Sequence, residues 1–246
     1  MKRHDHKILG LTFFNRSYDE LIKQINQEIH NQANCMIITP TTEILGVSMQ
    51  DEYLTKILAS STLLLPDSVS LIWVSKLLRK SFDRRVTGID TLYRLGKNKR
   101  KTYKVYYLGA KEAVLKKAVE VSTEIFPSFE IVGSHHGYYS ADETKAVIKD
   151  INSSKADILF VGLGFPKQEQ FIYEHRKDIH VPVKITVGGS FDVISGVLKR
   201  APLWMQKIAL EWAFRLIQEP SRIKRMSLIP VYLIRILYLE ISGKHK

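Results

Sequence analysis

The segment from Asp157 to Tyr173 reads DILFVGLGFPKQEQFIY, and it decides how the rest of the chain is interpreted. Ile158 to Val161 form an unbroken apolar run with the length of a strand that is buried on both faces. Gly162 and Gly164 follow, and Pro166 can stand in the first turn of a helix. The segment predicts a strand, a glycine turn and a helix start, the unit at which parallel sheets bind ligands. An ordinary turn without a ligand is the alternative.

The same alternation of short apolar runs and helical spacing continues on both sides of this segment. The other predicted strands are Ile8–Phe14, Cys35–Ile38, Thr62–Leu65, Val105–Leu108, Ile131–Gly133 and Val183–Val187. Between them lie helical patterns, the first of which begins with a capping box of Ser17 and Glu20. A later helical stripe is expected in the core: Val69, Ile72, Trp73, Leu77 and Leu78. This order predicts an α/β fold, Rossmann-like, with a mostly parallel sheet and helices on both faces.

The composition is that of an ordered protein with an excess of positive charge. Of 246 residues, 45% are hydrophobic and 25% are charged, as in a folded chain with a sizeable core. The formal net charge of +12 indicates a nucleic acid, an anionic membrane surface or a phosphorylated substrate as partner. More than half of this excess lies from residue 199 onward, where ten lysines and arginines accompany three glutamates.

Cysteine content and the N-terminus both indicate a reducing compartment. The single cysteine, Cys35, lies in an apolar run, which favours a buried small residue over a nucleophile. Residues 1–6 are charged, and the apolar stretch of a signal peptide does not follow them. We therefore expect a cytoplasmic protein.

The alternation stops after Gly196, and helices are predicted for the remaining residues. Ala201 to Glu219 have the spacing of one amphipathic helix, and Leu228 to Ile241 are strongly apolar but too short to cross a bilayer. A helix lying in the membrane interface suits the second segment, and a helical pair packed on the core is the alternative. We therefore divide the chain into an α/β catalytic core, residues 1–196, and a basic helical appendage, residues 197–246.

Polar residues and glycines follow the predicted strands, so a parallel sheet would bring them to one rim. They are Thr39, Thr41, Asp67, Arg85, Asp90, Gly109, Gly164, Lys167, Gln168, Glu169, Gly188 and Gly189. Asp67 is the most interesting carboxylate, because it follows a short strand and Pro66 and is expected to be fixed and partly desolvated. Such a carboxylate can act as a general base. An aspartate that caps the next helix is the alternative.

Several kinds of catalytic site have no counterpart in the sequence. There is no Walker pattern, no G-x-G-x-x-G and no G-x-S-x-G, which disfavours kinases, dinucleotide oxidoreductases and serine hydrolases. No Asp-x-Asp occurs, and the adjacent His135 and His136 are interpreted as loop histidines. A basic α/β module that binds nucleic acid is an alternative, but no recognition helix or RNP-like pattern supports it.

Three arginines near the C-terminus, Arg215, Arg222 and Arg225, form a second candidate site. A guanidinium offers a fork of N–H donors that suits phosphate oxygens and needs no metal. The three side chains could therefore stabilise a departing diphosphate. A solvated basic face is the alternative.

Taken together, the motifs resemble those of the WecG/TagA/CpsF family of bacterial glycosyltransferases over nearly the whole length. The matching words are Thr39-Pro40 with Glu43, Pro66-Asp67, Arg85-Val86-x-Gly88-x-Asp90, Leu108-Gly109, Gly164-x-Pro166-Lys167-Gln168-Glu169, Gly188-Gly189-x-Phe191-Asp192, Arg200-Ala201-Pro202, Leu210-Glu211-Trp212 and Glu219-Pro220-x-Arg222. Together they are highly specific.

The resemblance implies an inverting transfer of a sugar from a UDP-sugar to undecaprenyl-diphosphate-linked N-acetylglucosamine. The sugar would be N-acetylmannosamine or a related hexosamine or uronic acid, and the product would enter teichoic acid, capsule or exopolysaccharide. By the same resemblance Asp67 is the base, and Thr39 and Gln168 line the pocket. Arg215, Arg222 and Arg225 belong to an appendage that closes the site at the inner face of the cell membrane. The family is described as metal-independent, so no metal or other cofactor is expected.

The chain departs from the family pattern beside Asp67. The family commonly has Thr-Pro-Asn and Pro-Asp-Gly-x-Gly, whereas Thr41, Ser68 and Ser70 stand here. Without these glycines there is less room or a different backbone course. The identity of the sugar stays open, and a catalytically weak paralogue that recruits a partner to the membrane is the alternative function. Apolar stripes on the helices also leave a homodimer open.

Overall fold

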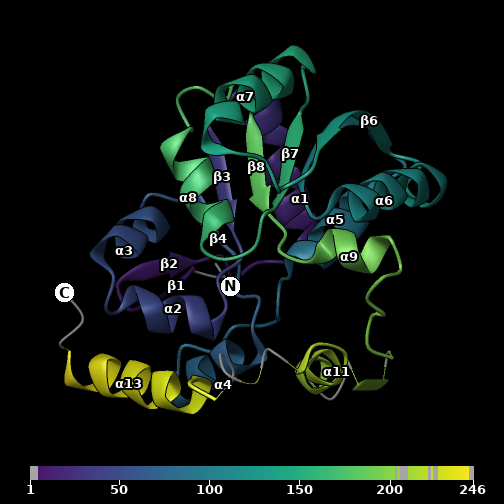
Figure 1. Cartoon of the computed structure of the whole chain (residues 1–246). Helices are drawn as coiled ribbons and strands as arrows, with labels where there is room; N and C mark the ends of the chain where they lie inside the picture. The colour runs from purple at the N-terminus through teal and green to yellow at the C-terminus, as the bar shows by residue number, and fades with distance from the viewer. Residues whose placement is uncertain (1–4, 203, 206–209, 221–222, 224–226, 244–246) are drawn as a thin grey trace.

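One sheet forms the centre of the molecule (Figure 1). In this computed structural model the described residues are 5–202, 204–205, 210–220, 223 and 227–243. Within them the strand order is β1-β2-β4-β3-β8-β7-β5-β6, and every pair except β1–β2 is parallel. The strands are β1 (His6–Ile8), β2 (Leu11–Phe13), β3 (Cys35–Ile38), β4 (Leu63–Leu64), β5 (Tyr103–Gly109), β6 (Phe129–His135), β7 (Ile158–Gly162) and β8 (Val183–Thr186). The predicted α/β class with a mostly parallel sheet is confirmed.

The first predicted strand is instead a hairpin. Leu9 and Gly10 separate β1 from β2 and adopt φ values of 52° and 74°. Positive φ at both central residues is the geometry of a two-residue hairpin turn, and glycine adopts it without strain. The prediction of one continuous strand over Ile8–Phe14 was therefore wrong, because the apolar run conceals a turn.

Helices cover both faces of the sheet. On one face lie α1 (Tyr18–His30), α5 (Gly88–Gly96), α6 (Glu112–Ile125) and α9 (Ser190–Ile194). On the other lie α2 (Thr42–Ser48), α3 (Glu52–Ala59), α7 (Thr144–Ser153) and α8 (Lys167–Glu174). The predicted capping box is present at the start of α1, where Ser17 and Glu20 bond each other's backbone N–H groups.

Alternation along the central strands divides the core between these two faces. In β7, Ile158 and Phe160 pack toward α1 and α6, whereas Leu159 and Val161 pack toward α7 and α8. All four side chains are fully buried, as the unbroken apolar run predicts for a strand covered on both faces. Burying each such side chain contributes roughly 1.5–3 kcal/mol, so the central strands are a rigid base for the loops that follow them.

A further helical layer lies at the carboxyl ends of the strands. Figure 1 shows the arrow of β8 directed toward the end of the molecule that holds α4 (Val69–Leu77), α11 (Glu211–Gln218) and α13 (Ile229–Ser242). Helix α13 packs on α2 and α4, and its Ile236 is fully buried in the same core. Glu240 accepts a hydrogen bond from the backbone N–H of Leu9 and pairs with Lys80. These contacts fasten the end of the chain to its beginning.

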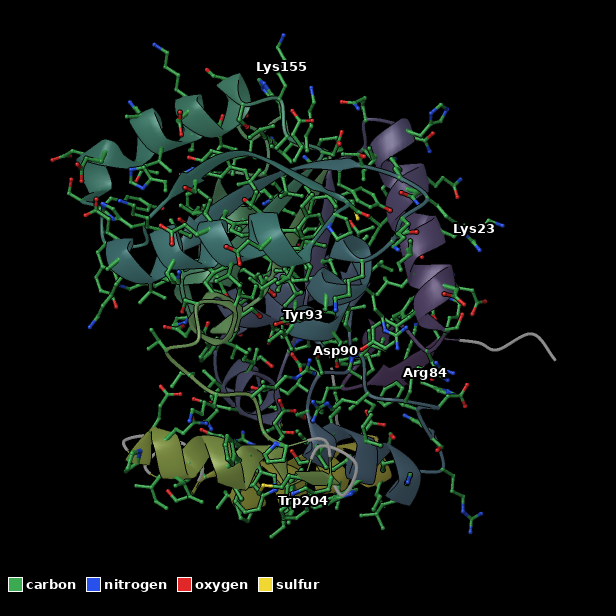
Figure 2. The ribbon with its side chains drawn as sticks, turned by 90° about the vertical axis from the view of Figure 1, so that its right-hand side faces the viewer. Lys23, Arg84, Asp90, Tyr93, Lys155 and Trp204 are labelled. Atoms are coloured by element: carbon green, nitrogen blue, oxygen red, sulfur yellow. The ribbon has the colours of Figure 1, made fainter. Side chains whose placement is uncertain are left out.

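This layer also carries exposed apolar side chains. Trp73 and Leu77 are 54% and 70% exposed, so the expectation that the whole α4 stripe lies in the core was wrong for these two residues. Helix α4 packs on the core along one face only, and the two side chains lie outside that contact. In the quarter-turn view of Figure 2, Trp204 lies in the same layer, at the opposite end of the molecule from Lys155.

The predicted C-terminal helices are found in part. Within the described residues α11 begins at Glu211 and Leu210 is not helical, so the single helix expected over Ala201–Glu219 was wrong. Leu228–Ile241 corresponds closely to α13. In the described chain, no helix combines the length and apolarity needed to cross a bilayer. The predicted division after residue 196 stays a prediction.

Gly46 lets α13 approach α2 closely, because a Cβ atom there would lie 2.1 Å from the ring of Tyr232. Gly46→Leu is therefore expected to displace α13 while leaving the sheet folded. Limited trypsin digestion should then cleave the C-terminal segment about tenfold faster, since cleavage follows local opening. Gln50→Leu, which places the same side chain on an exposed site nearby, is the control. Equal cleavage of both variants would contradict this packing role.

Candidate active site

A cleft of about 1050 Å³ lies at the carboxyl ends of the strands. Its volume is at the upper end of the range for ligand pockets. Most of the predicted rim residues line it: Thr39, Thr41, Asp67, Arg85, Gly164, Lys167, Gln168, Gly188 and Gly189. Side chains of α4, α11 and α13 complete the wall, among them Trp73, Trp212 and Leu233. The cleft thus lies between the sheet and the C-terminal helices.

The neighbouring strands β3 and β8 both end at the cleft, where Thr39 and Val187 line it. The backbone N–H of Thr39 donates to Thr186 Oγ1 at 3.0 Å, and Thr39 Oγ1 donates to the Thr186 carbonyl at 3.1 Å. From β3 the chain continues to β4 on one side, whereas β7, β5 and β6 lie on the other. A crevice at such a reversal of strand order is the usual ligand site of open parallel sheets.

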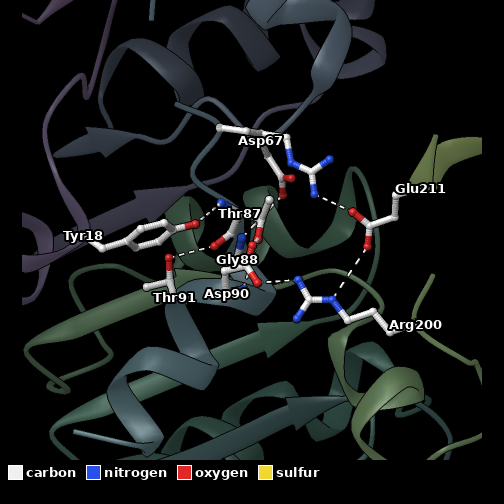
Figure 3. A network of polar contacts seen from close by, with 9 residues as sticks. Tyr18, Asp67, Thr87, Gly88, Asp90, Thr91, Arg200 and Glu211 are labelled. Atoms are coloured by element: carbon white, nitrogen blue, oxygen red, sulfur yellow. Dashed lines mark hydrogen bonds and ion pairs between the residues drawn. The ribbon is translucent and has the colours of Figure 1, made fainter. Parts of the chain in front are cut away.

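Asp67 lies in the cleft wall after β4. Its Oδ2 lies 3.5 Å from the backbone N–H of Gly88, which donates to it (Figure 3). The helix that follows is capped by Ser68, whose Oγ accepts from the backbone N–H of Leu71 at 3.1 Å. Since Ser68 performs the capping, the alternative role for Asp67 as a helix cap is not supported.

Asp67 faces a cationic neighbour. Burial of Arg85 favours its neutral form, but the negative charges of Asp67 and Glu211 outweigh this effect and raise the pKa of the guanidinium. Arg85 therefore stays charged in the cleft wall. A carboxylate held beside a fixed positive charge and a backbone N–H has a defined position relative to a bound ligand.

Glu211 of α11 connects two arginines (Figure 3). One of its carboxylate oxygens pairs with Arg85, and the other lies 3.9 Å from Nε of Arg200. Arg200 in turn pairs with Asp90. The Glu211 side chain is buried, so removal of one partner would leave a desolvated charge. These ion pairs hold α11 and residues 197–202 against the core.

Asp90 and Gly109, both predicted to bind substrate, do not line the cleft. Asp90 accepts a hydrogen bond from Thr87 Oγ1 at 2.8 Å at the start of α5, besides pairing with Arg200. Gly109 has φ 138°, and a Cβ atom there would lie 2.3 Å from the carbonyl oxygen of Gly162. Its role is the close approach of β5 to β7, which no larger residue would permit.

Gln168 lines the cleft and is fixed by two hydrogen bonds. The backbone N–H of Gly188 donates to Gln168 Oε1 at 3.1 Å, and Gln168 Nε2 donates to Glu169 Oε1 at 2.8 Å. A backbone N–H can only donate, so the amide oxygen must face Gly188 and the amide nitrogen must face Glu169. The orientation of the Gln168 amide is thereby determined.

Glu169 is a fully buried carboxyl group. Its Oε2 has no hydrogen-bond partner in the described part of the chain. Burial raises the pKa of Glu169 to about 7, against the opposing effect of the hydrogen bond from Gln168. No three His, Cys, Asp or Glu side chains of the described chain are grouped as metal ligands would be.

The predicted C-terminal arginines lie largely outside the described structure. The backbone of Arg215 belongs to α11, but its side chain and the whole of Arg222 and Arg225 are outside the described residues. Neighbouring side chains of the same segment, Trp212 and Glu219, do line the cleft. Sequence reasoning did not assign Glu211 to the site, although the Leu210-Glu211-Trp212 motif was a signal for it.

The fold and this cleft define an α/β enzyme of the doubly wound class, with its site at the carboxyl edge of a parallel sheet. The chain belongs to the glycosyl transferase WecG/TagA/CpsF family, whose profile matches residues 6–246. It is therefore a glycosyltransferase, as the motifs predicted.

Curated relatives cover almost the whole chain. A protein of Bacillus subtilis (strain 168) is 34% identical over 239 residues, which are 96% of this chain and 93% of its own length. A protein of Bacillus spizizenii is 37% identical over 86% of this chain and 82% of its own. A protein of Staphylococcus aureus (strain MW2) is 30% identical over 93% and 91%. Each is named N-acetylglucosaminyldiphosphoundecaprenol N-acetyl-beta-D-mannosaminyltransferase.

Glu169→Gln is expected to remove a pH dependence of stability. The folded protein binds this proton with a pKa of about 7, against an ordinary value of 4.5. Stability is therefore fullest below about pH 4.5 and is lost as the pH rises through 7, by about 3 kcal/mol in total. Urea unfolding at pH 5 and pH 8 should show this loss in the wild type and not in the variant.

The matched control is Glu174→Gln, which removes an exposed carboxylate from the same helix. This control should keep the wild-type slope of stability against pH. If Glu169→Gln also keeps that slope, the carboxyl of Glu169 is ionised throughout and the assignment of its raised pKa fails.

Proposed function

We propose that the enzyme transfers N-acetylmannosamine, or a related hexosamine or uronic acid, from a UDP-sugar to N-acetylglucosamine on undecaprenyl diphosphate. The names of the relatives support this specificity, because identity of 30–37% extends over most of both chains. The product would enter teichoic acid, capsule or exopolysaccharide. The observation that carries the proposal is the carboxylate of Asp67 in the wall of a large cleft, beside the guanidinium of Arg85.

In the proposed reaction Asp67 takes the proton from the attacking hydroxyl of the acceptor sugar. The hydroxyl oxygen forms a bond to the anomeric carbon while the bond from that carbon to the UDP oxygen breaks, which inverts the configuration. The electron pair leaves with UDP, and the proton stays on Asp67. No metal ion takes part in this scheme.

Charge on the departing UDP must be stabilised by the protein in this scheme. Arg85 is a fixed cation of the cleft wall, and the backbone turns at Gly164 and Gly189 have no side chain to keep a phosphate away. Arg215, Arg222 and Arg225 are proposed to add further guanidinium groups from the appendage. The ion pair of Glu211 with Arg85 supports closure of this segment over the site.

We further propose that the enzyme lies on the inner face of the cell membrane. The outer face of α13 carries Val231, Ile234, Tyr238 and Ile241, a spacing that places them in one stripe, and Ile234 and Ile241 are 69% and 80% exposed. Arg235 and Lys76 are exposed beside apolar side chains of the same layer. An apolar stripe with neighbouring cations is typical of a helix that lies in an anionic membrane interface.

Asp67→Asn is expected to lower kcat for sugar transfer by roughly 10²–10⁴-fold, because an amide cannot accept the proton. Binding of UDP should stay within about twofold, since the shape of the side chain is kept. Initial rates with purified acceptor and calorimetric titration with UDP measure the two effects. Asp142→Asn, at an exposed site, is the control.

Equal loss of UDP binding and turnover in Asp67→Asn would make Asp67 structural. A wild-type protein that binds UDP-sugars but transfers none of them would favour the second candidate, a catalytically weak paralogue. Thr41, Ser68 and Ser70, which depart from the family pattern and line the cleft, are the reason for considering that candidate.

The double variant Ile234→Glu/Ile241→Glu is expected to bind vesicles of anionic phospholipid about tenfold or more weakly, because both carboxylates would enter the interface. Co-sedimentation measures this effect, and transfer to a short-chain water-soluble acceptor should be retained. Lys155→Glu makes the same change in net charge at the opposite end of the molecule (Figure 2). Equal losses in the two proteins would point to net charge and against this surface.

A further inference from the structure

Three hydroxyl groups form a hydrogen-bonded chain in the cleft wall next to Asp67. Thr42 Oγ1 lies 2.8 Å from Ser68 Oγ and 2.6 Å from Ser70 Oγ. All three side chains line the cleft, Thr42 from α2 and the serines from the start of α4. We call Thr42, Ser68 and Ser70 the hydroxyl triad.

The number of protons in the hydroxyl triad leaves one donor for a ligand. Three hydroxyls carry three protons, and the two oxygen–oxygen contacts use two of them. Thr42 is only 1% exposed, so the remaining proton belongs to one of the serines. The oxygen of Ser68 already accepts from the backbone N–H of Leu71, which fixes that end of the triad. A serine O–H is therefore held in place for an acceptor atom in the cleft.

Ser70 has no helix-capping role that would explain it. Ser68 is the N-cap of α4, whereas the one partner of Ser70 Oγ among the described residues is Thr42. One turn further along α4, Trp73 also lines the cleft, and 54% of its surface is exposed. A flat apolar ring one turn from an ordered hydroxyl suits a sugar, which offers a C–H face to the ring and oxygens to the hydroxyl.

The position of this wall indicates which reactant it meets. Helix α13 packs on α2 and α4, and its Ile229, Pro230 and Leu233 line the cleft as well. The glycine turns, at Gly164 and Gly188–Gly189, follow β7 and β8 and belong to the sheet side of the cleft. A lipid-linked sugar enters most readily from an apolar wall, and a nucleotide diphosphate binds most readily at glycine turns.

We propose that the hydroxyl triad and Trp73 form the subsite for the hexosamine of the lipid-linked acceptor. The serine O–H donates to a hydroxyl or acetamido oxygen of that sugar, and the indole ring of Trp73 covers its apolar face. This assignment rests on the proposed function and adds specificity-determining residues to it. It also gives Ser68 and Ser70 a direct use at the point where Asp67 must meet the attacking hydroxyl.

Ser70→Ala is the direct test, because it removes one hydroxyl and leaves the cap of α4 intact. The KM for a short-chain N-acetylglucosaminyl-diphosphate lipid should rise about tenfold, the usual effect of one lost hydrogen bond to a ligand. The KM for the UDP-sugar and the Kd for UDP should change less than twofold. Ser70→Thr keeps the hydroxyl and should restore the acceptor KM.

Trp73→Ala gives an independent reading of the same subsite, with the acceptor KM again rising and UDP binding unchanged. Ser153→Ala removes an exposed hydroxyl on α7 and is the control for both variants. A rise in donor KM alone would overturn the assignment to the acceptor. An unchanged KM for both substrates in Ser70→Ala and in Trp73→Ala would overturn the assignment of this wall as the acceptor subsite.

These failures are distinct from failure of the proposed function. In each of them the wild type still transfers the sugar to the lipid-linked acceptor, and only the role of Ser70 and Trp73 is refuted. If the wild type shows no transfer to this acceptor, the proposed function and the subsite fall together.

Discussion

The ion pairs of Glu211 join the C-terminal segment to the α/β core. This carboxylate lies between Arg85, which lines the cleft, and Arg200, which continues to Asp90. Because the Glu211 side chain is buried, its charge is tolerable only while the guanidinium groups stay in place. The position of Arg85 beside Asp67, the packing of α11 and the enclosure of the cleft are thus parts of one electrostatic arrangement.

Much of the fold could be predicted because burial has a simple signature in sequence. Ile158–Val161 is apolar throughout because β7 is covered on both faces, and Ser17 with Glu20 marks a helix start by its own hydrogen bonds. The Leu9–Gly10 turn was missed because nothing in an apolar run indicates that a leucine adopts a positive φ. The interruption at Leu210 was missed because amphipathic spacing does not record where a helix breaks.

The candidate site was predictable in outline, because residues after parallel strands must gather at one edge. The individual roles of these residues depend on contacts between segments that are distant in the sequence. Asp90 pairs with Arg200, which is 110 residues away in the sequence. Gly109 lies in close contact with Gly162 of the neighbouring strand. Trp73 has the spacing of a core residue, but 54% of its surface is exposed and it lines the cleft. A sequence predicts which residues lie at the rim more readily than it distinguishes residues that contact a ligand from residues that support the structure.

Helix α13 is held at two separated points, by the contact of Tyr232 with Gly46 and by the bonds of Glu240 to Leu9 and Lys80. Contacts at two separated points oppose both rotation of the helix about its axis and swinging of either end. Its outer stripe therefore has a defined orientation relative to the central parallel strands, whose carboxyl ends are directed toward the same layer (Figure 1). Any flat surface that accepts the stripe would set the tilt of the whole molecule, and the mouth of the cleft would meet that surface at a constant height.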